Sequence, residues 1–224
     1  ETGVSPAGAP SAQATSSNAP PASHPAPSSP LRDARVWRAS LAIGLLCSPQ
    51  FAVLTFATVF LHDYCGAGIA TLTAVMVAVQ VGAMVARIAS GRWTDRRGNR
   101  RAYLRGCVWL GFTLFVALAG VAWAVRDTAT DPAAVATVAV LLAVAGICVS
   151  AWHGVAYTEL ATLAGAQRAG TALGLANTCV YLGLFLTPLA LPHLVAASSW
   201  PLAWGVAGGL MLAALPLLPR TARA

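Results

Sequence analysis

The chain has 224 residues, of which 57% are hydrophobic and only 9% charged, and its mean hydropathy is +0.68. A soluble domain carries about a quarter charged residues, so the composition indicates a lipid bilayer rather than water as the main solvent. All fourteen basic residues are arginines, and they punctuate apolar runs instead of forming one basic face, so no nucleic-acid partner is expected.

Residues 1–35 are predicted to be a disordered cytoplasmic linker or tail. The first thirty residues are rich in Pro, Ala and Ser and contain almost no large apolar side chain. Such a segment cannot bury enough surface to offset the entropy of ordering. It also has no apolar run that could act as a signal peptide, and because the chain begins at Glu1 we expect a truncated or processed start. A collar of three arginines, Arg32, Arg35 and Arg38, precedes the first apolar run.

Four long stretches with few or no charges follow in the first part of the chain. They are residues 39–62, 64–86, 106–125 and 131–158. Each is long enough to cross a hydrocarbon core of about 30 Å as a helix. The fourth begins with Asp131 and Pro132, an N-cap residue followed by the residue preferred at the first helical position. Each stretch therefore predicts one transmembrane helix.

The fifth uncharged stretch is too long for a single helix. Residues 169–219 contain no charge, and one helix of this length would span on the order of 75 Å. We place a break between Pro188 and Pro201, a region that combines helix breakers, polar groups and an interfacial Trp. The prediction is an all-α membrane protein with a six-helix transmembrane domain over 36–219 and a short cytoplasmic tail over 220–224.

The distribution of arginines predicts the orientation. Short loops rich in Arg stay on the cytoplasmic side of a membrane. With the collar inside, nine further arginines also fall inside and only Arg126 falls outside; the nine are Arg92, Arg96, Arg97, Arg100, Arg101, Arg105, Arg168, Arg220 and Arg223. Both termini are therefore predicted to be cytoplasmic, in a multi-pass protein of the inner or plasma membrane.

Residues 91–101, between the second and third helices, are the most informative stretch. Its two glycines would allow a short loop to turn between packed helices. Asp95 could accept hydrogen bonds at an exposed helix N-terminus, and the arginines suit an anionic leaflet. The same features would also serve an ordinary positive-inside loop.

This pattern resembles the signature cytoplasmic loop of the major facilitator superfamily. That loop has a glycine, three residues, Asp-Arg, one residue, a second glycine and then basic residues. The matching positions are Gly91, Asp95, Arg96, Gly98, Arg100 and Arg101. Trp93 and Asn99 depart from the pattern, but neither removes the turn or the charge. The stretch from Gly170 to Thr178 also resembles the eleventh helix of this superfamily.

The resemblance implies that the chain is the C-terminal half of a twelve-helix secondary transporter. Such a protein works by alternating access and holds a small solute near the midplane between its halves. The N-terminal six-helix half would be missing from this chain. The resemblance further implies that Asp95 engages a helix N-terminus in that half and acts in gating. It also implies that the third and sixth helices are peripheral, which agrees with their lack of amides, imidazoles and charges.

Polar side chains within lipid-spanning helices are costly and usually face a cavity or a partner helix. On this ground the candidate solute-binding residues are Gln50, Gln80, His153, Tyr157, Asn177 and Tyr181. Gln50 follows Ser48 and Pro49, and the proline would free a backbone carbonyl near mid-span. The alternative for any one of these residues is an interhelical hydrogen bond worth about 0.6 kcal/mol.

Energy coupling is only partly indicated, because no carboxylate lies at the centre of a span. A proton-coupled carrier would use either His153 or an acid in the missing half. Arg87 is expected to anchor the second helix near the loop, with binding of an anionic solute as the alternative. Glycines four residues apart, Gly170 with Gly174 and Gly205 with Gly209, predict close helix packing.

Other classes of membrane protein fit less well. An intramembrane enzyme would need a nucleophile motif, paired glutamates or two histidines at metal spacing, and none is present. We therefore expect no catalytic residue, no metal site and no cofactor. A pore would need a filter sequence, which is also missing. A six-helix scaffold or receptor remains the alternative to a transporter, although polar residues in four of the six helices argue against it.

Overall fold

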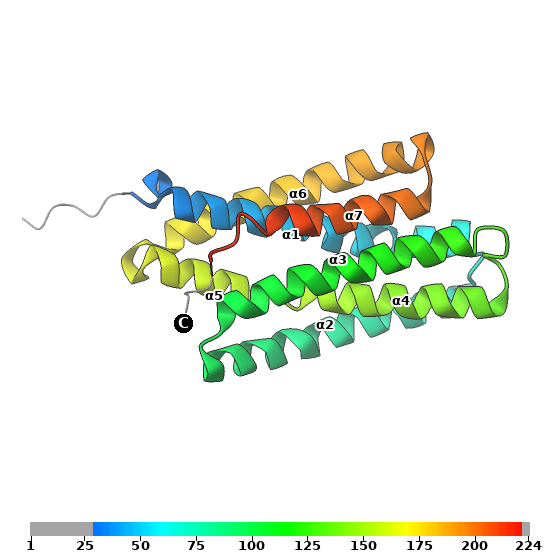
Figure 1. The fold of residues 1–224 in the computed structure, drawn as a ribbon, viewed down its shortest axis with the longest axis horizontal. Helices are drawn as coiled ribbons and strands as arrows, with labels where there is room; N and C mark the ends of the chain where they lie inside the picture. The colour runs from blue at the N-terminus through cyan, green and yellow to red at the C-terminus, as the bar shows by residue number, and fades with distance from the viewer. Residues whose placement is uncertain (1–28, 221–224) are drawn as a thin grey trace, which may run out of the picture.

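The computed structural model describes residues 29–220, which fold into a bundle of α-helices (Figure 1). Residues 1–28 of the tail predicted over 1–35, and the last four residues, lie outside the described part. Residues 29–35 are described, and they contain a 3₁₀ turn, Pro30–Arg32, and the start of the first helix at Ala34. The helices are α1 (Ala34–Val59), α2 (Ile69–Arg97), α3 (Arg100–Ala124), α4 (Pro132–Ser150), α5 (His153–Ala164), α6 (Ala169–Ala197) and α7 (Trp200–Ala214). A 3₁₀ turn precedes α1, and a π-helical turn, Phe60–Tyr64, extends it.

Five helical segments are long and apolar enough to cross a membrane. They are Ala34–Tyr64, Ile69–Arg97, Arg100–Ala124, Pro132–Ala164 and Ala166–Ala197. Helix α7 is apolar but has only 15 residues, so it covers about 22 Å and falls short of a full hydrocarbon core. The all-α multi-pass architecture predicted from the sequence is confirmed, with five full spans and a shorter sixth.

The break in the last apolar stretch lies within the predicted region, Pro188 to Pro201, but is much shorter than that region. Helix α6 continues through Pro188 and Pro192, and only Ser198 and Ser199 separate it from α7. Proline is tolerated within a membrane helix because neighbouring helices and Ser or Thr side chains compensate for the freed backbone groups. The prolines were therefore poor markers of the helix end here.

The fourth predicted span is a broken helix, which was not foreseen. Helix α4 ends at Ser150, a turn follows at Ala151 and Trp152, and α5 starts at His153. The helix also continues past Glu159, where the sequence had suggested its end. The break places a set of polar groups in the middle of an otherwise apolar span.

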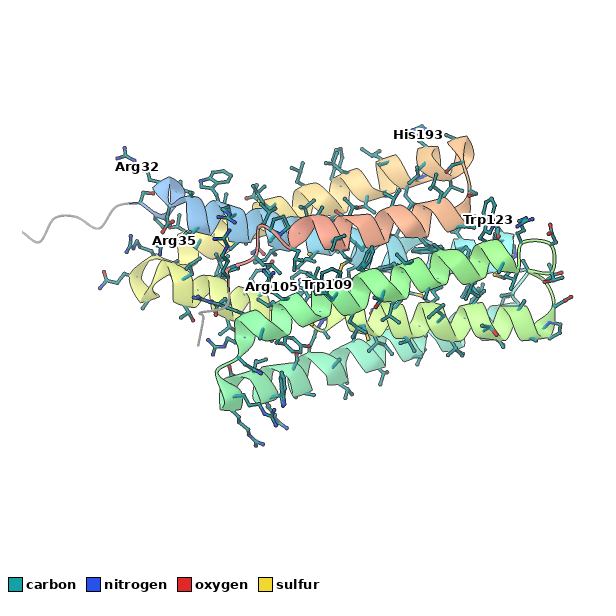
Figure 2. The ribbon with its side chains drawn as sticks, in the orientation of Figure 1. Arg32, Arg35, Arg105, Trp109, Trp123 and His193 are labelled. Atoms are coloured by element: carbon teal, nitrogen blue, oxygen red, sulfur yellow. The ribbon has the colours of Figure 1, made fainter. Side chains whose placement is uncertain are left out.

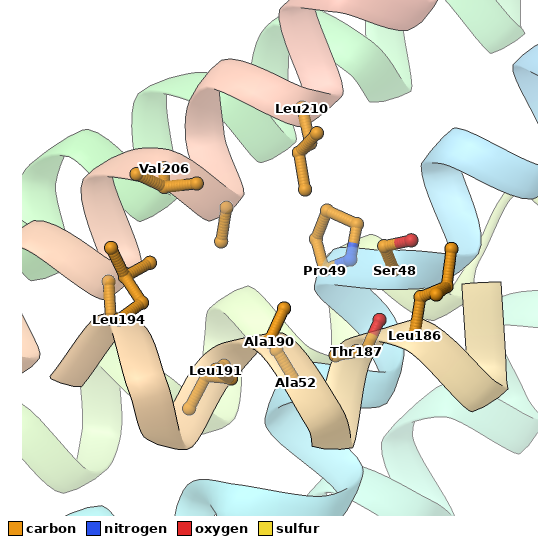
Figure 3. A pocket seen from close by; sticks show the side chains of 12 residues that line it. Ser48, Pro49, Ala52, Leu186, Thr187, Ala190, Leu191, Leu194, Val206 and Leu210 are labelled. Atoms are coloured by element: carbon orange, nitrogen blue, oxygen red, sulfur yellow. The ribbon is translucent and has the colours of Figure 1, made fainter. Parts of the chain in front are cut away.

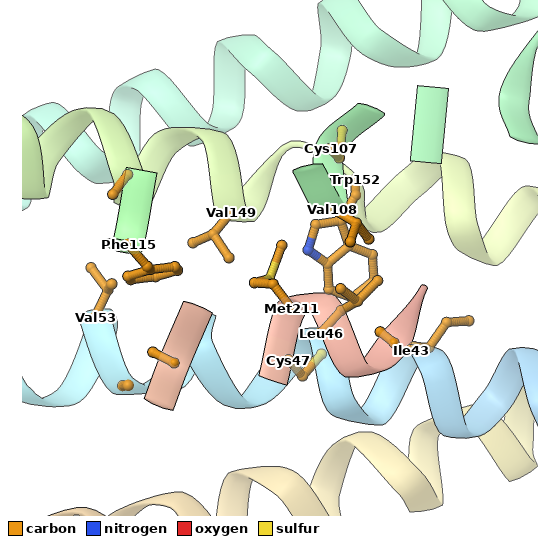
Figure 4. Packing of buried hydrophobic residues seen from close by; sticks show 14 of the residues in the cluster. Ile43, Leu46, Cys47, Val53, Cys107, Val108, Phe115, Val149, Trp152 and Met211 are labelled. Carbon is orange, nitrogen blue, oxygen red and sulfur yellow. The ribbon is translucent and has the colours of Figure 1, made fainter. Parts of the chain in front are cut away.

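The helices pack around a shared apolar core (Figure 4). Helix α1 packs against both α6 and α7, α3 packs against α7 and α4, and α2 packs against α4. Four aromatic residues, Phe60, Phe115, Trp152 and Trp204, are fully buried in this core. The core therefore joins the helices into one body and fixes the faces that they present outward.

Helices α1 and α6 approach each other closely, and this contact does not use the glycine pairs expected from the sequence. A Cβ atom on Gly44 would lie 2.9 Å from the backbone oxygen of Cys179. By contrast, Gly170, Gly174 and Gly209 have open space where a Cβ would stand. These three glycines are exposed, so the expectation that they mediate packing is wrong within the described chain. The fourth, Gly205, is half-buried, and a Cβ there would lie 4.0 Å from Ala119 on α3, which is ordinary contact rather than close packing.

The two ends of the bundle differ in chemistry (Figure 2). Arg32, Arg35 and Arg105 lie toward one end, while Trp123 and His193 lie toward the other. The first and last described residues also lie at the end rich in arginine, where the Arg101 side chain donates a hydrogen bond to the Arg220 carbonyl (3.3 Å). We call it the arginine-rich end.

Candidate functional site

Helices α5 and α6 meet through a cluster of polar and aromatic side chains that the sequence had singled out. The Tyr157 hydroxyl donates a 2.7 Å hydrogen bond to Oδ1 of Asn177. The His153 ring stacks on Tyr157, with ring centres 5.6 Å apart, and on Trp152 at 4.5 Å. We call these residues, together with Tyr181, the α5–α6 cluster. Asn177 and Tyr181 are exposed on α6, so the cluster has an open side.

The broken helix positions this cluster, and α2 holds the break in place. Arg87 donates from Nε to the Ser150 carbonyl at 3.0 Å, and the Ser90 hydroxyl lies 3.0 Å from the Ala151 carbonyl. Carbonyls at the end of a helix have no intrahelical partner, so side chains from another element must satisfy them. Arg87 was expected to anchor the second helix near the loop at the membrane surface, but in the structure its side chain binds a carbonyl at the break.

Several buried polar atoms have no hydrogen-bond partner within residues 29–220. They include Nε1 of Trp152 and Nδ1 of His153 at the break, and Oε1 of Gln50 on α1. An unsatisfied buried donor or acceptor costs about 1–3 kcal/mol. Such atoms are therefore suited to bind water or a polar solute that reaches them.

The structure does not bring all six predicted binding residues together. Gln50 is only 3% exposed and is buried within the bundle. Its neighbours Ser48 and Pro49 instead line an apolar cavity of about 340 Å³ between α1, α6 and α7 (Figure 3). Gln80 is exposed on α2, and its amide makes no hydrogen bond within the described residues. Only the residues on α5 and α6 form a contiguous group.

The predicted loop over residues 91–101 is mostly helical. Helix α2 continues to Arg97, Gly98 adopts a left-handed conformation with φ of 64°, and α3 starts at Arg100. Gly98 thus makes the turn, since other residues rarely adopt this φ. Gly91 lies within α2 with open space around its Cα, so the expectation that both glycines shape the turn is wrong.

Charged residues around this turn form an ion-pair network. Arg100 pairs with Asp95 at 2.7 Å and lies 3.4 Å from the Thr162 hydroxyl, while Arg101 pairs with Glu159 at 2.6 Å. These residues line a cavity of about 550 Å³. Arg96 is exposed and makes no hydrogen bond within the described chain. The ion pair between Arg101 and Glu159 on α5 was not predicted from the sequence, although Glu159 is the one acidic residue of α5.

A helical bundle with five segments that could span a membrane, a polar break inside one of them and an arginine-rich turn between α2 and α3 defines a polytopic membrane protein. The profile of the Major Facilitator Superfamily matches residues 39–224. The chain therefore belongs to the major facilitator superfamily, as the sequence motifs suggested.

Two curated relatives come from strains of Mycobacterium tuberculosis. They are "Uncharacterized MFS-type transporter Rv2994" of strain ATCC 25618 / H37Rv and "Uncharacterized MFS-type transporter MT3072" of strain CDC 1551 / Oshkosh. Each is 29% identical to the chain over 192 residues, which is 85% of this chain and 41% of the relative. The chain thus spans about two fifths of the length of these relatives. No solved structure matches it.

Proposed function

We propose that this chain is one six-helix half of an alternating-access carrier and that its α5–α6 cluster binds a small solute. The observation that carries the proposal is the Tyr157–Asn177 hydrogen bond beside the unpartnered buried atoms of the break. Asn177 and Tyr181 are exposed on a helix that is apolar enough to span a membrane. Polar groups at this depth are costly against lipid, so a water-filled cavity is the environment that suits them.

A second half would close this cavity. Helices α2 and α6 are the two spans with the smallest buried share in the described chain. Their exposed side chains include large apolar residues, among them Val81, Met84, Tyr181 and Phe185. These faces are suited to contact an N-terminal six-helix half, and the greater length of the curated relatives supports this arrangement.

The network at the arginine-rich end is suited to gating. Asp95 is paired with Arg100 inside this chain, and its side chain is 60% exposed. In the proposed carrier, Asp95 exchanges this partner for a helix N-terminus in the other half when one side of the cavity closes. The arginine-rich end would be cytoplasmic by the positive-inside rule, with both termini on that side of the plasma membrane.

If the proposed carrier is driven by protons, this chain offers one group that could carry the proton. His153 lies at the break, and its Nδ1 atom has no hydrogen-bond partner in the described residues. A neutral imidazole can accept a proton at one of its ring nitrogens. In the proposed carrier, His153 or an acid in the missing half carries the proton.

The test is solute uptake into proteoliposomes by this chain combined with an N-terminal half, measured over a panel of radiolabelled small solutes. Tyr157→Phe should lower uptake at least tenfold, because the tyrosine hydroxyl is lost from the binding cluster. Tyr64→Phe is the matched control, since Tyr64 also donates a 2.7 Å hydrogen bond between helices, to Ala122, but outside the cluster. Asp95→Asn should slow uptake without abolishing solute binding.

Three results would contradict the proposal. Equal losses from Tyr157→Phe and Tyr64→Phe would assign the cluster a structural role. Robust uptake by this chain alone, independent of Asp95, would mean a self-sufficient carrier instead of one half. A correctly folded pair of halves that moves none of the solutes and binds none of them would favour the scaffold or receptor alternative.

A further inference from the structure

A separate cavity at the arginine-rich end has both arginine and leucine side chains in its lining. It has a volume of about 350 Å³ and lies between α1, α3, α5 and the segment that follows α7. Its lining residues include Arg35, Arg38, Arg101, Arg220, Leu163 and Leu218. It shares no residue with the α5–α6 cluster, so solute binding there does not explain it.

The positive charge of this cavity is only half compensated. Arg35 pairs with Asp33 at 3.0 Å, and Arg101 pairs with Glu159 at 2.6 Å. Within residues 29–220, neither of the other two arginines of the lining has a carboxylate within ion-pair distance. Two of the four guanidinium charges therefore remain free to bind an anion.

Two hydrogen bonds hold the wall of the cavity in place. Arg38 donates from Nη2 to the Pro216 carbonyl at 2.6 Å, and Arg101 donates from Nη1 to the Arg220 carbonyl at 3.3 Å. These bonds tie the segment after α7 to the starts of α1 and α3. Because their acceptors are neutral, the bonds orient the guanidinium groups without cancelling their charge.

We propose that this cavity binds the phosphate of an anionic phospholipid from the adjacent leaflet. Guanidinium groups pair with phosphate oxygens in a two-pronged geometry. The lining residues lie where the apolar spans begin and end, which is the depth of lipid headgroups. The leucines of the lining suit the hydrocarbon part of a lipid, whereas an inorganic anion would leave them uncovered. Basic pockets between transmembrane helices are known to select anionic headgroups.

Arg220→Gln is the most direct variant. Within residues 29–220, the Arg220 guanidinium makes no hydrogen bond or ion pair, so its loss should leave the fold intact. Arg92→Gln is the matched control, because Arg92 is also exposed, also unpaired in the described chain, and outside the cavity. Both variants remove one positive charge near the same end of the bundle.

Native mass spectrometry of the purified chain should measure retention of phosphatidylglycerol against phosphatidylcholine. We expect the unmodified chain and Arg92→Gln to retain phosphatidylglycerol preferentially. Arg220→Gln should weaken its retention about tenfold, the effect of losing one charge-assisted hydrogen bond. Arg38→Lys should retain less than the unmodified chain, because a lysine keeps the charge but cannot pair with two phosphate oxygens.

Several outcomes would overturn the proposal. Equal retention of the two lipids would show that headgroup charge is not recognised. Equal losses from Arg220→Gln and Arg92→Gln would indicate a diffuse charge effect rather than a site. Displacement of the lipid by inorganic phosphate or glycerol phosphate at the same concentration as the lipid would identify a site for a soluble anion. None of these results depends on which solute the protein transports.

Discussion

The contact between α3 and α7 and the contact between α5 and α6 are built in opposite ways. On the first, Phe115 and Trp204 stack with ring centres 6.1 Å apart, and Gly208 lets the two helices come close. On the second, a hydrogen bond between Tyr157 and Asn177 joins helices whose polar groups stay exposed. In a bilayer, lipid competes with apolar contacts, so close packing must hold the first pair together, while polar contacts such as the second can be exchanged. The α3–α7 pair thus suits a permanent support and the α5–α6 pair a part that changes partners.

Removing the Trp204 side chain from the α3–α7 contact should give the largest loss of stability. Trp204 is fully buried and contacts Phe60 as well as Phe115. Trp204→Ala would leave a large cavity and should lower the free energy of unfolding by about 3 kcal/mol, the low end for soluble proteins, because lipid is itself apolar. The measurement is the midpoint of thermal unfolding of the purified chain in detergent.

Trp123→Ala is the control for this experiment. Trp123 is 57% exposed on the same helix as Phe115, so its loss should change the midpoint little. If both substitutions lowered the midpoint equally, the α3–α7 contact would not be the special support that the packing suggests.

Alanine substitutions at glycines of α1 and α6 test whether these two helices pack as closely as the structure indicates. A Cβ at Gly44 would press on the backbone of Cys179, whereas one at Gly174 would meet open space. Gly44→Ala should therefore destabilise the chain by about 1–2 kcal/mol through overpacking. Gly174→Ala should cause no loss, because alanine is the better helix former. Thermal midpoints of the two variants test this, and a larger loss for Gly174→Ala would mean that the helices pack differently.

The sequence was sufficient for the spans, the family and the composition of the α5–α6 cluster. Long uncharged stretches identify spans because hydrophobic length is a property of the sequence itself. His153 with Tyr157, and Asn177 with Tyr181, stand one turn apart, so their shared helix faces could be deduced from spacing.

The break at Ala151 and Trp152 could not be predicted in the same way. No proline or glycine marks it, and it is held by Arg87 and Ser90 from a different helix. Conversely, Pro188 suggested a break where α6 continues. Both errors have one cause: tertiary partners, which local sequence does not show, decide whether a backbone group can be freed from its helix.

The packing glycines show the same limit. A spacing of four residues places Gly170 and Gly174 on one face, but it does not say which face meets a neighbour. The position that α6 closes upon is Gly44 on α1. Ser40 and Ser48 stand four residues before and after it, but this spacing alone does not say which helix lies against it. Which helix faces contact each other, when the helices lie far apart in the chain, can therefore be read only from a structure.

The start of α1, the helix that packs against both α6 and α7, offers the smallest of the expected effects. Asp33 accepts hydrogen bonds from the side chain and the backbone N–H of Arg35, which lower its pKa below the usual value of 3.8. A carboxylate with a lowered pKa contributes stability above its usual pKa and loses it as the pH falls through the lowered one. Protection of the first turn of α1 from amide exchange should therefore fall only below about pH 4.

In Asp33→Asn, which keeps a capping side chain but has no ionisable group, this protection should be independent of pH in that range. A carboxyl titration of Asp33 at its usual pKa would show that the pair with Arg35 does not hold the start of the helix.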